Sequence, residues 1–174
     1  AHRIVLAASS DYFKKHFSSG MRDRDSERIK LSDVTAAGFE AALTFIYKRE
    51  CEVTESSLTE TMQAAAWLDV PVLLRAVASF VADKLTVEGI WNAWSIIDTF
   101  GGRAELASLE DACVALACRS LDELSSAAGF PSVPAERLVA VLGSDKLVGG
   151  EEEVWHVAMQ WLEAQDPAAG ADVV

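Results

Sequence analysis

The side chains in this sequence that could perform chemistry are widely spaced and form no recognisable catalytic motif. The histidines and cysteines are His2, His16, His156, Cys51, Cys113 and Cys118. No serine or cysteine stands in a nucleophile motif, no glycine-rich phosphate loop occurs, and no spacing of carboxylates and histidines suits a metal ion. We therefore predict a protein without catalytic residues, metal ligands or a cofactor.

The histidines and cysteines are expected to have structural roles. His2 is predicted to be packed and hydrogen-bonded in the core, and His16 to lie on a solvated face. The cysteines are odd in number, and their spacings match neither a C-x-x-C motif nor a zinc site. They are predicted to be free thiols, buried or half-buried, in a reducing compartment, with a redox role as the alternative.

A glycine pair and an acidic triplet are interpreted as helix boundaries rather than ligand sites. Gly101-Gly102 is expected to end a helix, because no strand precedes it as a phosphate cradle would require. Glu151-Glu152-Glu153 falls in the first turn of a predicted helix, where negative charge complements the helix dipole. A calcium site would instead need alternating carboxylates in a loop.

The composition favours a folded, acidic protein of one domain or two small ones. The chain has 174 residues, is 51% hydrophobic and carries a net charge of −12. This charge argues against binding to nucleic acid or to anionic membranes, because both need clustered Lys and Arg side chains. No apolar run approaches the roughly 20 residues that a bilayer-spanning helix requires.

The spacing of apolar residues is helical along almost the whole chain. Helices are predicted over 3–18 (continuous or broken), 36–47, 57–68, 71–85, 87–100, 105–124, 134–142 and 151–162. Two short alternating segments, 29–31 and 51–53, are predicted as strands. The change from mixed to purely helical patterns indicates two units joined near residues 84–86.

Motifs in the first half resemble those of BTB/POZ domains, and the helices after residue 85 resemble a BACK domain. The BTB-like motifs are Ala1-His2-Arg3-x-Val5-Leu6-Ala7-Ala8-x-Ser10-x-Tyr12-Phe13, Ile29-x-Leu31-x-Asp33-Val34, Phe39-x-x-x-Leu43-x-Phe45-Ile46-Tyr47 and Ala64-Ala65-x-x-Leu68-x-Val70. The BACK-like motif is Leu142-x-Ser144-Asp145-x-Leu147, followed by Glu151 and Trp161-Leu162. One departure is Lys48-Arg49, which replaces the Thr-Gly turn of many relatives.

The resemblance implies a mainly α fold with a small β component. A partial BTB/POZ α/β domain is expected at 1–84, an all-α BACK domain at 85–167 and a frayed tail at 168–174. The first strand, first helix and first hairpin of a BTB domain are expected upstream of Ala1. Those elements normally build the homodimer interface, so their absence is expected to weaken it.

BTB followed by BACK is the arrangement of Kelch-like proteins, and this implies a function. Many such proteins are non-catalytic adaptors of a cullin-3 RING ubiquitin ligase, which hold cullin-3 through the BTB domain and the first BACK helices. The full-length protein is then expected to be a homodimer that binds its substrate through a separate domain. A cytoplasmic location is expected, with the nucleus possible. The alternative is a dimerising BTB–BACK scaffold in transcription or the cytoskeleton that binds no cullin.

The first predicted cullin-binding site consists of Phe17, near the end of a helix, and the loop that follows it. Met21-Arg22-Asp23 matches the pattern of a hydrophobic residue, any residue and an acid that cullin-binding BTB domains often show there. An apolar side chain at Met21 would fill a pocket on the partner, and the carboxylate of Asp23 would accept hydrogen bonds from it. Alternatively, Met21 covers its own core and Asp23 is solvated.

Trp91 is the second predicted contact. On a helix over 87–100 it falls among polar residues, whereas Trp94 falls on the apolar face and is predicted to be buried. An exposed tryptophan on the first BACK helix would suit a partner, because tryptophan is enriched in binding hot spots. Packing at the BTB–BACK junction is the alternative.

Overall fold

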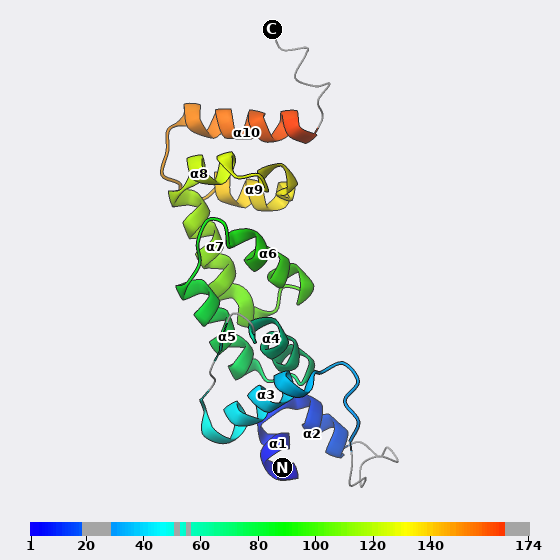
Figure 1. Ribbon diagram of the computed structural model, residues 1–174. Coiled ribbons are helices and arrows are strands. Elements are labelled where there is room, and N and C mark those ends of the chain that lie inside the picture. Colours follow the sequence, from blue (N-terminus) through cyan, green and yellow to red (C-terminus); the bar gives the residue numbers. More distant parts are fainter. Residues whose placement is uncertain (19–28, 51–52, 55–56, 166–174) are drawn as a thin grey trace. The chain divides into compact units, whose positions relative to one another are not determined.

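The computed structural model describes residues 1–18, 29–50, 53–54 and 57–165. The chain divides into two compact units, which are built from the helices labelled in Figure 1. The first unit consists of residues 1–81 and 103–106, and the second of residues 82–102 and 107 onward. None of the described helices is long and apolar enough to cross a membrane.

The first unit is a cluster of short helices around an apolar core. Its described elements are α1 (Arg3–Ser9), α2 (Asp11–Ser18), α3 (Ala36–Lys48), α4 (Leu58–Trp67), α5 (Pro71–Asp83) and the short 3-10 helix η2 (Ala104–Leu106). α1 packs against α2, and α3 packs against α4. The buried side chains of this unit include Phe13 on α2, Phe45 on α3 and Met62 on α4, and α5 adds Leu73 and Val77. The predicted start of a helix at Pro71 is confirmed.

Gly38 allows α3 and α4 to approach closely. A Cβ atom at this position would lie 2.5 Å from the carbonyl oxygen of Glu60, which is closer than two such atoms can pack. α3 begins here because Thr35 Oγ1 accepts a hydrogen bond from the Gly38 N–H at 3.1 Å, which satisfies one of the first-turn donors. The same glycine therefore donates to the capping side chain of Thr35 and permits the close contact between α3 and α4.

The predicted helix over 3–18 is broken at Ser10, which is buried and extended. The Ser10 hydroxyl donates a hydrogen bond to the Leu68 carbonyl and accepts one from the Phe13 N–H at 3.1 Å. Serine competes with the helix in this way because its side chain can bond to backbone groups in a non-helical conformation. The break therefore separates α1 from α2 and begins α2 with a side-chain cap.

α3 ends at Arg49, a residue other than glycine in a backbone conformation that favours glycine. Arg49 has φ 60° and ψ 22°, a left-handed conformation, and its N–H bonds to the Phe45 carbonyl at 2.8 Å. Glycine is the usual residue in this position because it has no Cβ. The guanidinium carbon of Arg49 lies 5.8 Å from the centre of the Phe45 ring, which places this side chain back along the helix it ends.

The second unit consists entirely of helices and turns in its described residues. Its elements are α6 (Ile90–Thr99), α7 (Ala107–Arg119), α8 (Leu121–Ser126), the 3-10 helix η3 (Phe130–Ser132), α9 (Ala135–Leu142) and α10 (Glu151–Gln165). The predicted helix stop is confirmed, since Gly101 and Gly102 have φ values of 70° and 61°. The helix predicted over 105–124 is divided instead, because Ser120 leaves helical geometry with φ −126° and ψ 43°.

α10 packs on the rest of the second unit through one face. Val157 is buried, the Trp161 Nε1–H donates to the Val133 carbonyl at 3.0 Å, and the Gln160 amide donates to the Ser125 carbonyl at 3.1 Å. The opposite face carries Trp155, which is 67% exposed, and Leu162, which is 50% exposed. This helix is therefore apolar on two sides, of which one is packed within the unit.

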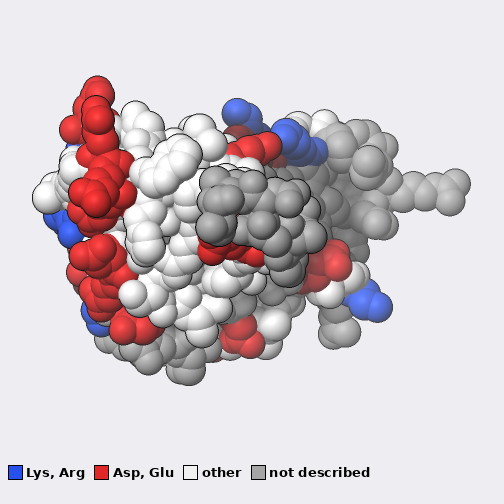
Figure 2. Space-filling view, turned by 90° about the horizontal axis from the view of Figure 1, so that it is seen from above, with Lys and Arg blue, Asp and Glu red and all other residues white. Residues whose placement is uncertain are grey.

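Acidic side chains dominate the surface, with 27 Asp and Glu against 15 Lys and Arg. Seen from above in Figure 2, acidic side chains gather along one side of the molecule, and few basic ones are visible. The first turn of α10 is acidic as predicted, with Glu151, Glu152 and Glu153 at its start. These charges favour the helix because its N-terminal end is positive.

The mainly helical fold class is confirmed. The described residues of the predicted strands, 29–31 and 53, form no strand. Alternation of apolar residues produces a strand only where a neighbouring strand supplies its backbone hydrogen bonds, and no such neighbour lies in the described part of the chain. The predicted domain boundaries and the tail at 168–174 stay predictions, and the tail lies outside the described residues.

We predict that Ser10→Ala lowers the free energy of unfolding by about 1–3 kcal/mol. The change leaves the Phe13 N–H without its buried acceptor and removes the bond to Leu68. Ser18→Ala is the matched control, because Ser18 is exposed and its hydroxyl donates to the Lys14 carbonyl within its own helix. It should change stability by less than about 0.5 kcal/mol. Equal effects in urea unfolding would contradict the role of Ser10.

We also predict that Cys113 resists alkylation in the folded protein. Burial raises the pKa of its thiol from 9.0 to about 12, so little thiolate forms at pH 9. The stability gained from the neutral thiol is therefore complete below pH 9 and is lost as the pH rises toward 12. Peptide mapping after iodoacetamide treatment at pH 9 should show labelling at least roughly a hundredfold slower than in denaturant. Equal labelling rates in the folded and the denatured protein would contradict the burial of the Cys113 thiol.

Candidate partner-binding surface

The structure places only part of the predicted cullin-binding site. Met21 and Asp23 lie outside the described residues. Phe17, at the end of α2, is half-buried and stacks on Phe13 with ring centres 5.7 Å apart and an angle of 19°. The Arg3 guanidinium carbon lies 4.6 Å from the centre of the Phe17 ring. Phe17 is therefore a rigid support at the point where the chain leaves α2.

Trp91 is half-buried within the second unit. Its ring meets Trp94 edge to face, with centres 5.5 Å apart, and a Cβ atom placed on Gly129 would lie 3.0 Å from the Trp91 ring. Trp94 itself is 4% exposed, which confirms the prediction that it belongs to the core. Gly129 thus allows Trp91 to pack flat against the connection between α8 and η3, and part of the indole is left accessible.

Two histidine predictions need correction. His2 is exposed rather than buried, although it is hydrogen-bonded, since its backbone N–H donates to the Tyr47 hydroxyl at 2.6 Å. His16 is half-buried rather than solvated, because its ring stacks on Tyr12 at 6.0 Å and meets Phe17 edge to face at 5.6 Å. The burial of His16 comes from its aromatic neighbours, and the bond from His2 reaches Tyr47, which is too distant in sequence for a helical pattern to reveal.

Three rings of the first unit form a cluster that we call the aromatic surface: Tyr12, His16 and Trp67. Tyr12 and His16 are four residues apart and therefore neighbours on α2. Trp67 ends α4, and its ring centre lies 4.4 Å from that of Tyr12. Partial burial among these rings raises the pKa of the Tyr12 hydroxyl above its ordinary value of 10.0. All three side chains remain partly accessible.

The aromatic surface borders a cavity of about 370 Å³. The cavity is lined by Tyr12, Lys15, His16, Ala66, Trp67, Asp69 and Arg103. The side chains of Lys15 and Arg103 are 80% and 38% exposed, and together with Asp69 they leave one net positive charge at the edge of the cavity in an acidic protein. Apolar rings beside exposed cations suit a protein partner with an apolar anchor and nearby carboxylates.

The turn between α4 and α5 positions this surface. Asp69 has φ 53°, and its backbone carbonyl accepts a hydrogen bond from the Asp11 N–H at 3.1 Å. Its carboxylate lies 3.2 Å from Arg103 Nη1 and 3.9 Å from Lys15 Nζ. The Leu68 carbonyl accepts the Ser10 hydroxyl. These bonds bring the start of α2 to the end of α4, where Tyr12 meets Trp67.

Sequence reasoning missed Trp67, Asp69 and Arg103 as site residues. Trp67 stands at an unspecified position of the BTB-like motif, and Arg103 follows the glycine pair that was interpreted only as a helix stop. A large aromatic directly before the buried Leu68 was the available signal. Among the described residues no group of three or more His, Cys, Asp or Glu could hold a metal ion, and the site consists of rings and ion pairs.

Two known domain families match successive segments of the chain. Residues 1–85 match the BTB/POZ domain family, and residues 97–173 match the BACK family, described as "BTB And C-terminal Kelch". The chain carries a BTB/POZ domain followed by a BACK domain. The aromatic surface therefore lies in the segment that matches the BTB/POZ domain family, and Trp91 lies between the two matched segments. Arg103, which lines the cavity beside that surface, lies in the segment that matches the BACK family.

The chain is similar to Kelch-like proteins along nearly its whole length. It is 31% identical to Kelch-like protein 26 of Homo sapiens, over 97% of this chain and 27% of that protein. It is 28% identical to Kelch-like protein 13 of Bos taurus, over 95% of this chain and 25% of that protein. It is 30% identical to Kelch-like protein 15 of Mus musculus, over 93% of this chain and 27% of that protein. The chain thus spans about a quarter of the length of these curated relatives.

We predict that position 69 tolerates asparagine but not valine. Asparagine adopts positive φ values with little cost, and the lost ion pairs are too exposed to contribute much, so Asp69→Asn should cost less than about 1 kcal/mol. Asp69→Val forces a β-branched residue into the left-handed region and should cost about 1–3 kcal/mol more. Urea unfolding of both variants measures the difference. Similar midpoints would show that the turn is not under this constraint.

Proposed function

We propose that this protein is a non-catalytic adaptor of a cullin-3 RING ubiquitin ligase. The observation that carries the proposal is the order of its domains, BTB/POZ and then BACK, along a chain similar to Kelch-like proteins. In this function the BTB/POZ domain and the first BACK helices hold the cullin. The substrate binds a further domain of the full-length protein, and the cytoplasm is the proposed location, with the nucleus as the alternative.

The aromatic surface supports a docking role for the BTB/POZ domain. Its rings are held in place by packing within the unit, so binding would cost little side-chain entropy. Tyrosine and tryptophan are among the residues that most often dominate binding energy when a partner covers them. Lys15 adds an exposed positive charge beside the rings, which favours a partner with an acidic patch.

The proposed cullin contacts join this surface to the residues that the sequence indicated. Met21 and Asp23 follow α2 directly in the chain, and Phe17 lies at the end of that helix, five residues from Tyr12. Trp91 would extend the contact onto the first BACK helix, α6. The full-length protein is proposed to be a homodimer, as the family resemblance implies.

We predict that Tyr12→Ala weakens binding of the N-terminal region of cullin-3 by about thirtyfold, which corresponds to roughly 2 kcal/mol. The change removes the ring that contacts both Trp67 and His16. Lys15→Glu should weaken binding more at low salt than at high salt, because it reverses an exposed charge whose interactions are screened by salt. Isothermal titration of the whole chain measures both effects, and circular dichroism checks that the variants are folded.

Trp155→Ala is the matched control, since it removes an exposed aromatic from α10 and should leave cullin binding unchanged. Met21→Asp and Asp23→Lys, measured in the same titration, test the loop. If Tyr12→Ala binds like the unmodified chain, the aromatic surface is not the docking site. If the unmodified chain does not bind more tightly than roughly 100 μM, the adaptor function is wrong and the dimerising scaffold is favoured.

A further inference from the structure

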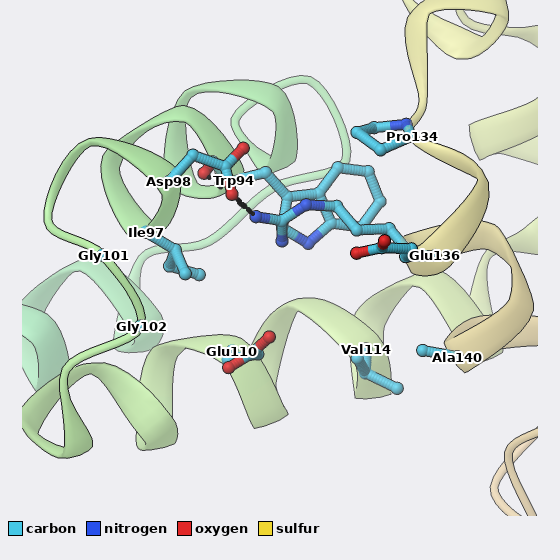
Figure 3. A pocket seen from close by; sticks show the side chains of 11 residues that line it. Trp94, Ile97, Asp98, Gly101, Gly102, Glu110, Val114, Pro134, Glu136 and Ala140 are labelled. Atoms are coloured by element: carbon cyan, nitrogen blue, oxygen red, sulfur yellow. Dashed lines mark hydrogen bonds and ion pairs between the residues drawn. The ribbon is translucent and has the colours of Figure 1, made fainter.

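A second cavity of about 390 Å³ lies within the second unit, between α6, α7 and α9 (Figure 3). Its apolar lining includes Trp94 and Ile97 from α6 and Val114 from α7, while Pro134 and Ala140 come from the α9 side. This cavity shares no lining residue with the cavity that borders the aromatic surface. The proposed cullin contacts include Trp91 on α6 but none of the residues that line this cavity.

The glycine pair keeps one side of this cavity open. Gly101 and Gly102 both have positive φ values, and a Cβ atom placed on either would meet no other atom within 4 Å. The turn after α6 therefore presents bare backbone at the edge of the cavity. An extended chain could approach this edge closely, because no side chain blocks it.

The only cationic group of the described lining, Arg137, is neutralised inside the protein. Its side chain is 14% exposed and forms an ion pair with the Asp98 carboxylate. It also donates to the Trp94 carbonyl at 3.3 Å, and its guanidinium carbon lies 5.3 Å from the centre of the Trp94 ring. Its Nη2 group bonds to both the Trp94 carbonyl and the Asp98 carboxylate, so this arginine joins α9 to α6 and its positive charge is paired with Asp98.

The remaining charges of the lining are carboxylates. Glu110 on α7 and Glu136 on α9 are exposed, and neither forms an ion pair with any described residue. Figure 3 shows the Glu110 and Glu136 side chains among the residues that surround the cavity. The cavity therefore combines an apolar floor with net negative charge, in a chain whose own net charge is −12. Charge complementarity favours a cationic occupant.

We propose that this cavity binds a basic segment of a partner protein, with an arginine or lysine side chain entering beside Glu110 and Glu136. The methylene groups of such a side chain would cover Val114 and Ala140, and its charged end would pair with the two glutamates. A divalent cation is a poorer occupant, because no group of three potential ligands occurs among the described residues. Nucleic acid and anionic lipid are disfavoured by the sign of the charge.

The test uses a fluorescein-labelled octapeptide of alternating arginine and leucine, titrated with the whole chain and followed by fluorescence anisotropy. Glu110→Gln combined with Glu136→Gln should weaken binding at least tenfold. Glu151→Gln combined with Glu152→Gln is the matched control, because it removes the same charge from exposed positions on α10. The control should change the affinity less than twofold. A peptide with glutamate in place of arginine should not bind.

Ala140→Phe separates this cavity from other acidic or apolar surfaces. Ala140 is exposed and lines the cavity, so a phenylalanine there should fill it and abolish binding without loss of charge. An equal loss in the glutamate control would mean non-specific attraction to an acidic protein and would overturn the proposal. Absence of binding at millimolar protein, or full binding by Ala140→Phe, would overturn it as well. Thermal unfolding of each variant confirms that it is folded.

Discussion

The first unit depends on the turn at Leu68–Val70, because its backbone carbonyls and one carboxylate tie together segments that are distant in sequence. The Leu68 carbonyl accepts the Ser10 hydroxyl, and the Asp69 carbonyl accepts the Asp11 N–H. The Asp69 carboxylate pairs with Lys15 and Arg103. These interactions hold the α4–α5 turn, the start of α2 and the residue before η2 in one arrangement. The Tyr12 and Trp67 rings are thereby brought into contact.

In the second unit too, side chains that bond to backbone carbonyls join one helix to another segment. Arg137 on α9 donates to a backbone carbonyl of α6 and pairs with Asp98 on the same helix. Trp161 and Gln160 join α10 to backbone carbonyls of the segments below it. Short helices contribute little stability alone, so side-chain bonds to carbonyls at helix ends and turns supplement the apolar core. Such bonds determine which side chains remain exposed for partners.

Local features could be predicted from the sequence, and tertiary ones could not. Pro71 begins a helix and Gly101-Gly102 ends one through backbone geometry alone, and both boundaries were predicted correctly. A break within 3–18 was left open without a position, and the break at Ser120 was not predicted, because the apolar period continues through both serines. Likewise, no periodicity indicates that Trp67 meets α2 or that Arg103 lines the cavity beside it. The loop with Met21 and Asp23 was indicated by family resemblance, and it stays a prediction.

Hydrogen exchange of the chain with and without the N-terminal region of cullin-3 tests the central claim most directly. In the proposed function, the α4–α5 turn holds together a docking surface made by α2 and the end of α4. Binding of cullin-3 should then slow amide exchange in 11–18 and 64–70 and leave exchange in α10 unchanged. Unchanged exchange in those two segments, or protection confined to α10, would contradict it.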